Sequence, residues 1–559
     1  MRSGVVGVGA GSSDPSGSTF SRFVHSPLGD RGRRKSTSRR RVAGPRSRIR
    51  WAPDGLPRLR VVRLDNLVAE LPGARVVGDA AVDVRDLAYD SRKAGAGTLF
   101  FCVPGEKRDG HDFASPVVAA GAVALVVERK LEVAVPQVVV EDARAAMAPL
   151  AARFFGDPTG ELRVVGVTGT NGKTTTTFLV REILEATGVQ CGLLGTVKQV
   201  VGGAEEPVER TTPEAIDLQS TFRRMLDGGD RACAMEVSSH AMVLHRAAAI
   251  HFAVVLFTNL TQDHLDFHGT MEEYFAAKRK LFEAGPRTAV VNLDDPYGRR
   301  LAAEFDCLTF SAAGREAHFV ADNVQVDATG AKFDVLRASG AGAVASGGTR
   351  LPPGGVVHVR TRLPAHFNVA NALGAFVVAV ALGIEPDDVA AALARAAAPP
   401  GRLEPVEAGQ DFAVLVDYAH TPDSLENVLA AARRVTEGRL IAVFGAGGDR
   451  DRDKRPKMGR AGGELADLAV ITSDNPRSED PARIVAEVAA GVPGDAEVET
   501  EVDRRTGIAR ALARARAGDT VVIAGKGHEG YQEFEGGRRI DFDDREVARE
   551  ELRKLGSAA

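Results

Sequence analysis

The sequence predicts an α/β protein with three domains. Short apolar, β-branched runs alternate with helical patterns along most of the chain, which is typical of parallel sheets covered by helices. In the middle and last parts of the chain, each apolar run ends in a cluster of polar residues, as expected where parallel strands end at one edge of a sheet. The length of 559 residues exceeds what one hydrophobic core supports, so several domains are expected.

The first sixty residues are predicted to be a disordered basic tail. Residues 30–50 read DRGRRKSTSRRRVAGPRSRIR, and the first fifty residues are rich in Arg, Ser and Gly and almost free of acid. A segment with so little apolar surface cannot offset the entropy lost on ordering. An organelle transit peptide has the same composition and is the alternative interpretation of this segment.

Two Pro- and Gly-bearing segments mark the domain boundaries. FFGDPTGELR (154–163) and APPGRLE (398–404) each interrupt the periodic pattern. We therefore predict a small α/β N-terminal domain over residues 61–160. A central doubly wound parallel sheet is predicted over 161–398, and a Rossmann-like C-terminal domain over 399–559.

The strands of each domain are predicted from the apolar runs. In the N-terminal domain they are TLFFCVPG (98–105), AVALVVE (122–128) and PQVVVED (136–142). In the central domain they are RVVGV (163–167), RACAMEV (231–237), FAVVLFTNL (252–260) and TAVVNLDD (288–295). In the C-terminal domain they are AVLVDYAH (413–420), LIAVFGAGGDRD (440–451), LAVITSDNPR (468–477) and TVVIAGKGHE (520–529). Within GAGGDR, Arg450 stands where a dinucleotide-binding motif needs its third glycine, which disfavours a nicotinamide or flavin site.

The run VVGVTGTNGKTTT at 164–176 predicts a phosphate loop in the central domain. A buried strand leads into a Gly-rich turn and then a helix, so that backbone N–H groups and the positive helix end surround a phosphate. Lys173 would reach the β- and γ-phosphates, and the Thr174 hydroxyl would ligate Mg²⁺. The strict pattern needs a glycine at Val167, so the motif is a shorter G-x-x-G-K-T from Gly169. ATP binding is the favoured interpretation, and an ordinary strand-to-helix turn is the alternative.

Composition argues against several classes of function. The formal net charge is only −4, so nothing in the balance suggests nucleic acid or a membrane surface as a partner. No apolar run approaches the length that spans a bilayer; GAFVVAVALG at 374–383 is too short. The cysteines lack C-x-x-C spacing, which argues against a thiolate metal site and fits a reducing cytosol. They are Cys102, Cys191, Cys233 and Cys307.

Several polar residues at predicted strand ends could do chemistry. Glu236 could hold Mg²⁺ against the phosphates, because a hard cation needs oxygen ligands beyond those of the loop. His264, Asp266 and His268 could form a metal or acid/base site, or a polar loop with satisfied histidines. Lys278 lies in a helical stretch, where the residue pattern by itself favours a solvated lysine.

The stretch Asp474-Asn-Pro-Arg477 ends another predicted strand. Pro476 would restrict the turn, and Arg477 offers a rigid fork for a carboxylate. Arg450 and Glu529 end neighbouring strands. Together these residues suit a zwitterionic substrate, although a strand-ending turn with a surface arginine remains the alternative.

With these motifs in place, residues 61–555 resemble the Mur ligases, the ATP-dependent amino-acid ligases of peptidoglycan synthesis. The resemblance rests on twelve ordered landmarks. They are DSRKAGAGTLFFCVPG (90–105), GVTGTNGKTTT (166–176), RTTPEA (210–215), MEVSSHA (235–241), FTNLTQDHLDFHG (257–269), YFAAKRKLF (274–282), HFNVANALGA (366–375), GRLE (401–404), VDYAHTPDSL (416–425), FGAGGDRDRDKRPKMG (444–459), SDNPR (473–477) and AGKGHEGYQ (524–532).

The resemblance implies a role for each matching position. ATP would bind Gly169, Thr170, Asn171, Gly172, Lys173, Thr174 and Thr175, with Asn368, Asn371, Arg402 and Asp417 framing the nucleotide. The UDP-sugar dipeptide would bind Tyr89, Ser91, Thr211, Thr212, Ser238 and Arg246. The incoming amino acid would bind Arg450, Asp474, Asn475, Pro476, Arg477, Gly525 and Glu529. Catalysis would rest on Lys173, Glu236, His264 and Lys278, and the metal positions would be Thr174, Glu236, His264 and Lys278.

The resemblance also implies the reaction. It implies that ATP activates the D-glutamate γ-carboxylate of UDP-N-acetylmuramoyl-L-alanyl-D-glutamate as an acyl phosphate, and that meso-2,6-diaminopimelate then captures it. Two Mg²⁺ ions would assist, and Lys278 would react with CO₂ to give N6-carboxylysine. The three domains would bind the UDP-sugar, ATP and the amino acid in chain order. We expect a cytoplasmic monomer that acts on small molecules.

Two positions depart from the family pattern. Leu244 stands where members carry a Gln that contacts the sugar nucleotide, and Glu106-Lys107-Arg108 replaces other polar residues.

Three other functions are alternatives to a Mur ligase. A folylpolyglutamate synthase-like ligase shares the nucleotide machinery but is disfavoured by the N-terminal domain and the DNPR and GKGHE motifs. A P-loop switch or motor would need no amino-acid site. A non-catalytic nucleotide-binding protein would not need the predicted Mg²⁺ ligands.

Overall fold

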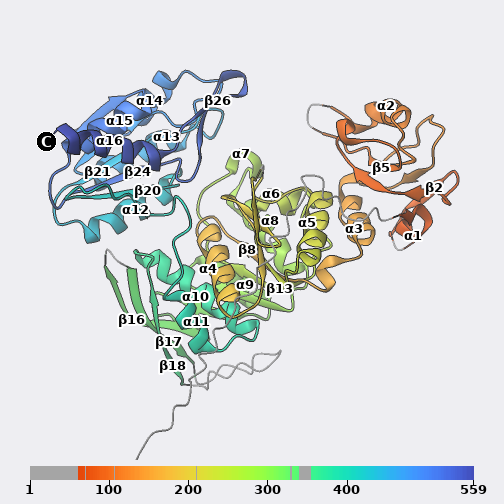
Figure 1. Cartoon of the computed structure of the whole chain (residues 1–559), viewed down its shortest axis with the longest axis horizontal. Helices are drawn as coiled ribbons and strands as arrows, with labels where there is room; N and C mark the ends of the chain where they lie inside the picture. Colours follow the sequence, from red (N-terminus) through yellow and green to blue (C-terminus); the bar gives the residue numbers. More distant parts are fainter. Residues whose placement is uncertain are drawn as a thin grey trace, which may run out of the picture. The chain divides into compact units, whose positions relative to one another are not determined.

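The computed structural model describes residues 61–69, 71–105, 108–208, 210–327, 330–338 and 354–558. The predicted tail over residues 1–60 lies outside this range, as do Glu106 and Lys107 of the divergent loop. Three large sheets follow one another along the chain, and helices pack on them (Figure 1). The predicted α/β class with three domains is thereby confirmed, while the individual domain boundaries stay predictions.

The first sheet has five strands in the order β2-β7-β6-β5-β4. Their bounds are β2 Arg75–Val77, β4 Asp86–Ala88, β5 Thr98–Phe101, β6 Ala124–Val127 and β7 Gln137–Val139. All neighbours are parallel except β2 and β7. The helical segments are α1 Leu64–Val68, η1 Ser91–Lys93, η2 Gly110–Phe113, α2 Ala114–Ala119, α3 Ala143–Phe155 and η3 Pro158–Gly160, and a two-stranded sheet pairs β1 Val62–Arg63 with β3 Asp83–Val84.

The second sheet has eleven strands in the order β11-β10-β9-β12-β8-β13-β14-β15-β16-β17-β18. Their bounds are β8 Arg163–Thr168, β9 Cys191–Leu194, β10 Gln199–Val201, β11 Ala204–Glu206, β12 Ala232–Glu236, β13 Phe252–Phe257, β14 Thr288–Asn292, β15 Leu308–Ser311, β16 Phe319–Asp327, β17 Gly330–Arg337 and β18 Val356–Thr361. From β9 to β16 every neighbouring pair is parallel, as predicted.

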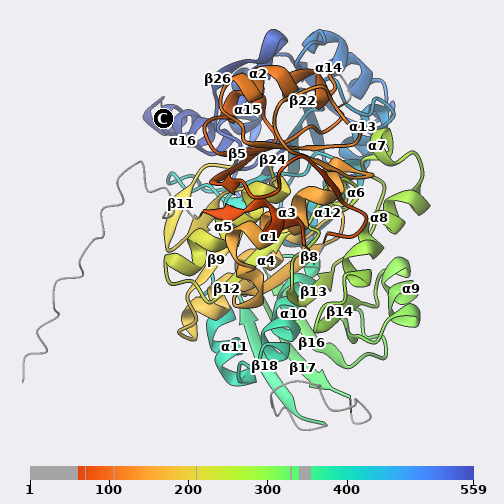
Figure 2. The same ribbon diagram turned by 90° about the vertical axis from the view of Figure 1, so that its right-hand side faces the viewer.

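Both edges of this sheet are antiparallel, which the sequence pattern did not predict. At one edge β9, β10 and β11 form a meander, and the turn between β10 and β11 contains Gly202 and Gly203 with φ of 57° and 81°. A two-residue turn of this kind reverses the chain and can only join antiparallel strands. At the other edge β16, β17 and β18 pair in the same way, and Figure 2 shows them below β14 and α10.

Helices cover both faces of the central sheet. They are α4 Lys173–Ala186, α5 Ala215–Asp227, α6 Ser239–Val243, α7 Leu265–His268, α8 Met271–Glu283, α9 Pro296–Glu304, α10 His366–Ala381 and α11 Pro386–Leu393. One apolar core packs α4, α10 and α11 against the sheet, and the other packs α5, α8 and α9. The strands therefore read as continuous apolar runs because they are buried on both faces.

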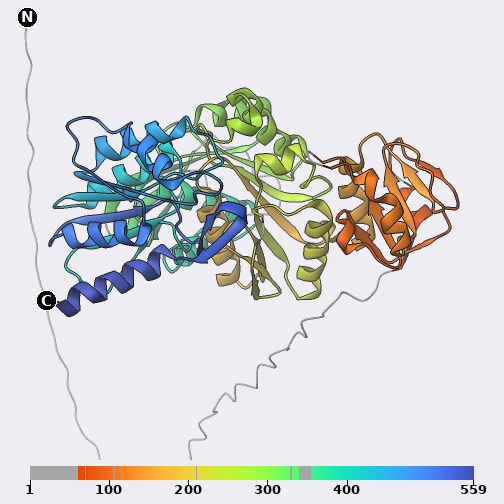
Figure 3. The same ribbon diagram turned by 90° about the horizontal axis from the view of Figure 1, so that it is seen from above.

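The third sheet has six strands in the order β19-β20-β24-β21-β22-β23. Their bounds are β19 Glu404–Pro405, β20 Ala413–Asp417, β21 Leu440–Phe444, β22 Leu468–Thr472, β23 Val498–Glu501 and β24 Thr520–Ala524. All pairs are parallel except β19 with β20. The helices are α12 Pro422–Val435, α13 Lys454–Leu465, α14 Pro481–Ala489, α15 Arg504–Arg514 and α16 Asp544–Ala558, and β25 Tyr531–Phe534, η4 Glu535–Gly537 and β26 Arg538–Asp541 form a hairpin. Figure 3 shows α16 as the last helix, close to the C-terminus.

Candidate active site

The predicted phosphate loop joins β8 to α4, and its two glycines are required by geometry. Gly169 has a φ of 146°, and a Cβ there would lie 1.9 Å from Thr258 Oγ1. Gly172 has a φ of 85°, and a Cβ there would lie 2.3 Å from Asn371 Oδ1. Only glycine combines positive φ with such close approaches, so both positions exclude side chains.

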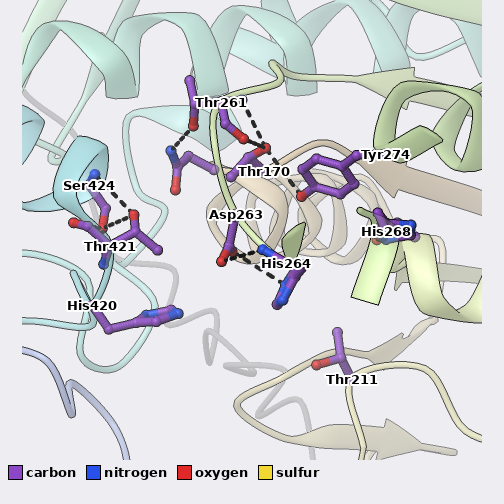
Figure 4. Close-up of polar contacts among 12 residues, drawn as sticks. Thr170, Thr211, Thr261, Asp263, His264, His268, Tyr274, His420, Thr421 and Ser424 are labelled. Atoms are coloured by element: carbon purple, nitrogen blue, oxygen red, sulfur yellow. Dashed lines mark hydrogen bonds and ion pairs between the residues drawn. The ribbon is translucent and has the colours of Figure 1, made fainter. Parts of the chain in front are cut away.

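Neighbouring chain segments hold this loop in place. The Thr170 N–H donates to the Asn259 carbonyl at 2.9 Å, and the Asn171 N–H donates to Asn259 Oδ1 at 2.9 Å. Thr170 Oγ1 also lies 3.3 Å from the Tyr274 hydroxyl (Figure 4). The loop is therefore fixed before any ligand binds, with the N-terminus of α4 pointing into the space where an anion would bind.

Two lysine amines meet at one carbonyl oxygen of the loop. Lys173 Nζ donates to the Gly169 carbonyl at 2.9 Å and to that of Thr170 at 2.8 Å, and Lys278 Nζ donates to the same Gly169 carbonyl at 2.8 Å. Burial lowers the pKa of Lys173, although the negative charges of Glu236 and Asp263 oppose this shift.

Lys278 projects from α8 and is only 1% exposed. Burial, and next the positive charge of Lys173, hold the pKa of Lys278 well below its usual value. Its Nζ lies 4.4 Å from the centre of the Tyr274 ring. A lowered pKa increases the fraction of the amine that is neutral and nucleophilic, compared with a solvated surface lysine.

Glu236 ends β12 and is 1% exposed. Its Oε1 accepts hydrogen bonds from Thr174 Oγ1 at 3.0 Å and from the Thr196 N–H at 2.8 Å, and its Oε2 accepts one from Thr196 Oγ1 at 3.1 Å. A carboxylate beside the helix-start hydroxyl is an oxygen donor set that suits Mg²⁺. Among the described residues no group of three or more His, Cys, Asp or Glu side chains could hold a metal, so phosphate oxygens and water would have to complete the shell.

His264 begins α7 with a φ of 54°. Its Nε2 lies 3.3 Å from Asp263 Oδ2, and Figure 4 shows this pair beside Thr170 and Tyr274. Desolvation lowers the pKa of His264 to about 4, despite the opposing charge of Asp263, so its imidazole is neutral at pH 7. Asp266 is exposed on α7, and His268 is buried with Nε2 2.8 Å from Ser239 Oγ. His268 is thus a satisfied histidine, whereas His264 is available to a ligand.

One cleft of about 210 Å³ collects all four predicted catalytic side chains, Lys173, Glu236, His264 and Lys278. They come from four segments that are far apart in the chain: the start of α4, the end of β12, the residue before α7 and the middle of α8. Other predicted residues that line the cleft are Thr170, Asn171, Gly172, Thr174, Thr175, Thr211, Ser238, Arg402 and Asp417. A larger apolar cavity of about 390 Å³ lies along β19, β20 and α12, and its lining includes none of the predicted site residues.

The segment that follows the central sheet reaches back to the phosphate loop. Arg402 Nη2 donates to Thr174 Oγ1 at 3.2 Å, and the Arg402 guanidinium lies 4.7 Å from the centre of the Tyr418 ring. Asp417 accepts the Leu403 N–H at 2.7 Å, and burial raises its pKa. Asn371 faces Gly172 and donates to Asn368 Oδ1 at 3.0 Å, so Asn368 supports the loop from behind without lining the cleft.

The predicted sugar-dipeptide residues line the cleft only in part. Thr212 Oγ1 donates to the Glu236 carbonyl at 2.9 Å and accepts the Ser238 N–H at 3.2 Å. Arg246 pairs with Glu214 at 2.9 Å. Tyr89 donates from its hydroxyl to Asp217 Oδ2 at 2.7 Å, and Ser91 begins η1. Tyr89, Ser91, Thr212 and Arg246 do not line the cleft, and Leu244 ends the short helix α6.

The predicted amino-acid residues gather at the carboxyl ends of β22 and β24 rather than in the cleft. Asn475 Nδ2 donates to Glu529 Oε2 at 2.9 Å, and a Cβ on Gly525 would lie 2.7 Å from Asp474 Oδ2. Arg477, which follows Pro476, has a φ of 51° and donates from Nη1 to the Gly448 carbonyl at 2.7 Å. Arg450 is exposed and donates to the Asp449 carbonyl at 3.1 Å.

Three residues of these sites were missed by the sequence analysis. Thr196 positions Glu236 but belongs to no motif. Lys526 is fully buried, and its Nζ donates to Asn475 Oδ1 at 3.0 Å and to Glu529 Oε2 at 2.9 Å. Tyr418 lines the cleft and donates from its hydroxyl to Glu529 Oε1 at 3.4 Å, so it connects the two clusters. The GKGHE motif contained the only signal for Lys526.

Known proteins that are similar to this chain cover most of its length. Family models match three parts of the chain: "Mur ligase family, catalytic domain" matches residues 83–155, "Mur ligase middle domain" matches 167–379, and "Mur ligase, glutamate ligase domain" matches 401–527. The UDP-N-acetylmuramoyl-L-alanyl-D-glutamate–2,6-diaminopimelate ligase of Geobacillus thermodenitrificans is 45% identical over 500 residues, which cover 87% of this chain and 99% of the relative.

Solved structures show the same similarity. The structure of a UDP-N-acetylmuramoyl-L-alanyl-D-glutamate–2,6-diaminopimelate ligase superposes with a TM-score of 0.63 at 31% identity, covering 89% of this chain and 99% of that one. The MurF ligase of Thermotoga maritima in complex with ADP superposes with a TM-score of 0.57 at 20% identity, covering 85% of this chain and 99% of that one. The second similarity shows a shared fold.

We predict that His268 makes the protein less stable in acid. Burial lowers the pKa of His268 to about 4, whereas an unfolded histidine titrates near 6.5. Between these values the unfolded state binds the extra proton, so stability falls as the pH drops from about 6.5 towards 4. His268→Gln should therefore show a smaller drop in melting temperature between neutral and acidic pH than the wild type.

The control for this experiment is His251→Gln, because the His251 side chain is 62% exposed. For each protein, the change in melting temperature between neutral and acidic pH is compared, and not the melting temperature at one pH. This is necessary because loss of the Ser239 hydrogen bond lowers the stability of His268→Gln at every pH. An equal pH-dependent drop in wild type and His268→Gln would contradict the proposed cause.

Proposed function

We infer the function of this chain, which belongs to the Mur ligase family. It is an ATP-dependent ligase that joins meso-2,6-diaminopimelate to the D-glutamate γ-carboxylate of UDP-N-acetylmuramoyl-L-alanyl-D-glutamate, with release of ADP and phosphate. The observation that carries this conclusion is the single cleft lined by Lys173, Glu236, His264 and Lys278. The 45% identity over nearly the whole length of a relative named for this reaction supports the choice of substrates.

The chemistry requires activation before amide formation. A carboxylate does not react with an amine because its leaving group would be oxide, whereas an acyl phosphate expels phosphate readily. Transfer of the γ-phosphoryl group of ATP to the γ-carboxylate therefore comes first, and attack by the diaminopimelate amine follows through a tetrahedral intermediate. Lys173 and the N-terminus of α4 line the cleft, and in this proposal they would stabilise the charge of the transferred group.

The donor set fits Mg²⁺, and Thr174 and Glu236 would hold it beside the phosphates. When bound, the ion neutralises charge that develops on the phosphoryl oxygens. We propose that His264 and a modified Lys278 hold a second ion, which the neutral imidazole of His264 and their shared cleft support. Thr196 fixes both Glu236 oxygens and thereby keeps the carboxylate turned towards Thr174.

Lys278 is proposed to carry a carbamate. In its neutral form, which the lowered pKa favours, the amine would add to CO₂ and release one proton, and this converts a buried base into an anion suited to a cation in the cleft. The burial of Lys278, the charge of Lys173 beside it and its contact with the phosphate loop support this modification. A lysine that stayed protonated at this position could not react with CO₂.

The three predicted domains divide the substrates between them in this proposal. Residues 61–160 contact the UDP-sugar through Tyr89 and Ser91, residues 161–398 hold ATP, and residues 399–559 hold the amino acid. Arg477 would bind the carboxylate that diaminopimelate has and L-lysine lacks, and Glu529 would bind an ammonium group.

The four free cysteines support the predicted cytoplasmic location. No described helix has the length and apolar character needed to cross a bilayer.

The reaction itself is tested by ADP release from the full chain. With ATP, Mg²⁺ and the UDP-muramoyl-dipeptide acceptor, we expect ADP release that depends on meso-diaminopimelate, while L-lysine in its place gives at most a few per cent of that rate. Arg477→Ala should lower the ratio of the rate with meso-diaminopimelate to the rate with L-lysine by about tenfold or more, because one charged contact with the substrate is lost. ADP release without any acceptor would instead indicate a nucleotide switch. ADP release that depends on a pteroylglutamate acceptor would indicate a folylpolyglutamate synthase-like ligase.

Lys173→Ala should lower kcat by about a thousandfold or more, because the cation beside the transferred phosphoryl group is lost. The measurement is steady-state ADP release with all three substrates, together with circular dichroism to show that the variant is folded. A folded variant with near-normal kcat would contradict the proposed role of the loop.

Lys278→Ala should lower kcat by about a hundredfold, since the anion that holds the second cation is lost. Lys280→Ala on the same helix is the matched control, because Lys280 is exposed, and it should leave kcat within about twofold of the wild type. Native mass spectrometry of the wild type in bicarbonate should detect the added CO₂, and the adduct should be absent from Lys278→Ala. An adduct that persists in that variant would overturn the assignment.

A further inference from the structure

A fully buried ion pair lies behind the amino-acid cluster. Arg504, on α15, is 1% exposed, and Asp544, at the start of α16, is 0% exposed. Arg504 Nε donates to Asp544 Oδ1 at 2.8 Å, and Arg504 Nη2 donates to Asp544 Oδ2 at 2.7 Å. The pair is therefore bidentate and has no contact with solvent.

The same guanidinium also binds the ends of two strands. Arg504 Nη1 donates to the Ser473 carbonyl at 3.1 Å, and Nη2 donates to the Ala524 carbonyl at 3.0 Å. Ser473 directly follows β22, and Ala524 is the last residue of β24. These strands are not neighbours, because β21 lies between them in the sheet. Arg504 thus connects two strand ends across a third strand.

The two strand ends lead directly into the proposed amino-acid site. Asp474 follows Ser473, and Gly525 follows Ala524. The two turns fit closely, because Gly525 has a φ of 121° and a Cβ there would lie 2.7 Å from Asp474 Oδ2. A small change in the separation of β22 and β24 would therefore move the groups that meet the substrate, since Asn475 and Glu529 are hydrogen-bonded across this gap at 2.9 Å.

Stability alone is a poor reason for this pair. Desolvation of two charges commonly outweighs their attraction, and apolar residues of similar size often stabilise a core equally well. What an apolar pair cannot supply is a rigid planar fork that fixes two carbonyls and a carboxylate at once. The geometry is that of a spacer, which sets the distance between two loops.

We propose that Arg504 and Asp544 are positioning residues for the amino-acid substrate. The pair holds the 474–477 and 525–529 turns at the separation that a doubly charged amino acid needs, and it does so without touching the substrate. This inference rests on the proposed function, in which those turns bind diaminopimelate. ATP and the acceptor bind elsewhere, so their binding does not depend on the pair.

The test compares Arg504→Lys with a matched control. Lysine keeps the charge but cannot reach Asp544 and both carbonyls together. The control is Arg505→Lys on the same helix: Arg505 pairs with Glu550 and Glu551 of α16 at 2.7 and 2.9 Å but contacts neither strand end in the described hydrogen bonds. KM is measured separately for meso-diaminopimelate, ATP and the acceptor in the full chain.

In Arg504→Lys we expect the KM for meso-diaminopimelate to rise about tenfold or more, with the other two KM values within about twofold of the wild type. Arg505→Lys should leave all three within about twofold. If Arg504→Lys does not fold, Asp544→Asn is used, because it keeps the shape and weakens the fork; it should raise the same KM selectively. A parallel rise in all three KM values, or no rise in a folded variant, would overturn the proposal.

The outcome can be separated from that of the proposed function. If the wild type uses another amino acid in place of diaminopimelate, the proposed substrate is wrong, and the KM comparison is made with the amino acid that is used. A selective rise for that amino acid would still support the positioning role. Equal KM values for it in wild type and Arg504→Lys would refute the role whichever substrate is correct.

Discussion

The carbonyl oxygen of Gly169 accepts hydrogen bonds from two amines, those of half-buried Lys173 and buried Lys278, and the cleft is arranged around this contact. Two ammonium groups cannot share one buried acceptor without strong repulsion, so the arrangement favours a neutral amine on one of them. The negative charges of Glu236 and Asp263 both raise the pKa of Lys173 and so oppose the loss of its proton. Of these two carboxylates, only Asp263 raises the pKa of Lys278. In the proposed function, the backbone of one glycine thereby separates the cation that binds phosphate from the amine that adds to CO₂.

The C-terminal cluster uses buried charge in a related way. Lys526 is enclosed between Asn475 and Glu529, and Arg504 is enclosed between two carbonyls and Asp544. Charges that cannot be solvated must keep their partners, so each one restricts the positions of the groups around it. Recognition of an amino acid with several charged ends requires this rigidity, because misplaced partners would leave charges unpaired. Tyr418 connects this cluster to the cleft through Glu529.

Much of the fold could be predicted from local pattern. The run from Val164 to Thr176 contains a strand, a turn that only glycine permits and a helix start, and all three appear where they were expected. The antiparallel edges were not predicted, because the short runs of β10 and β11 carry no long periodic signal. Thr196 and Lys526 were missed for another reason: their importance lies in partners that are distant in the sequence or hidden in the core.

The sequence by itself determined the alternation of parallel strands with helices, the phosphate loop and the family, because these depend on spacing within short segments. Only the tertiary structure decided that Lys278 is buried beside Lys173, and that His268 is satisfied while His264 lines the cleft. It also decided that the residues proposed to bind the amino acid form a cluster separate from the cleft. The physical reason is that a side chain becomes buried, and gains its charged partners, only when the ends of different strands meet. The parallel sheet brings together at one edge residues that are far apart in the chain.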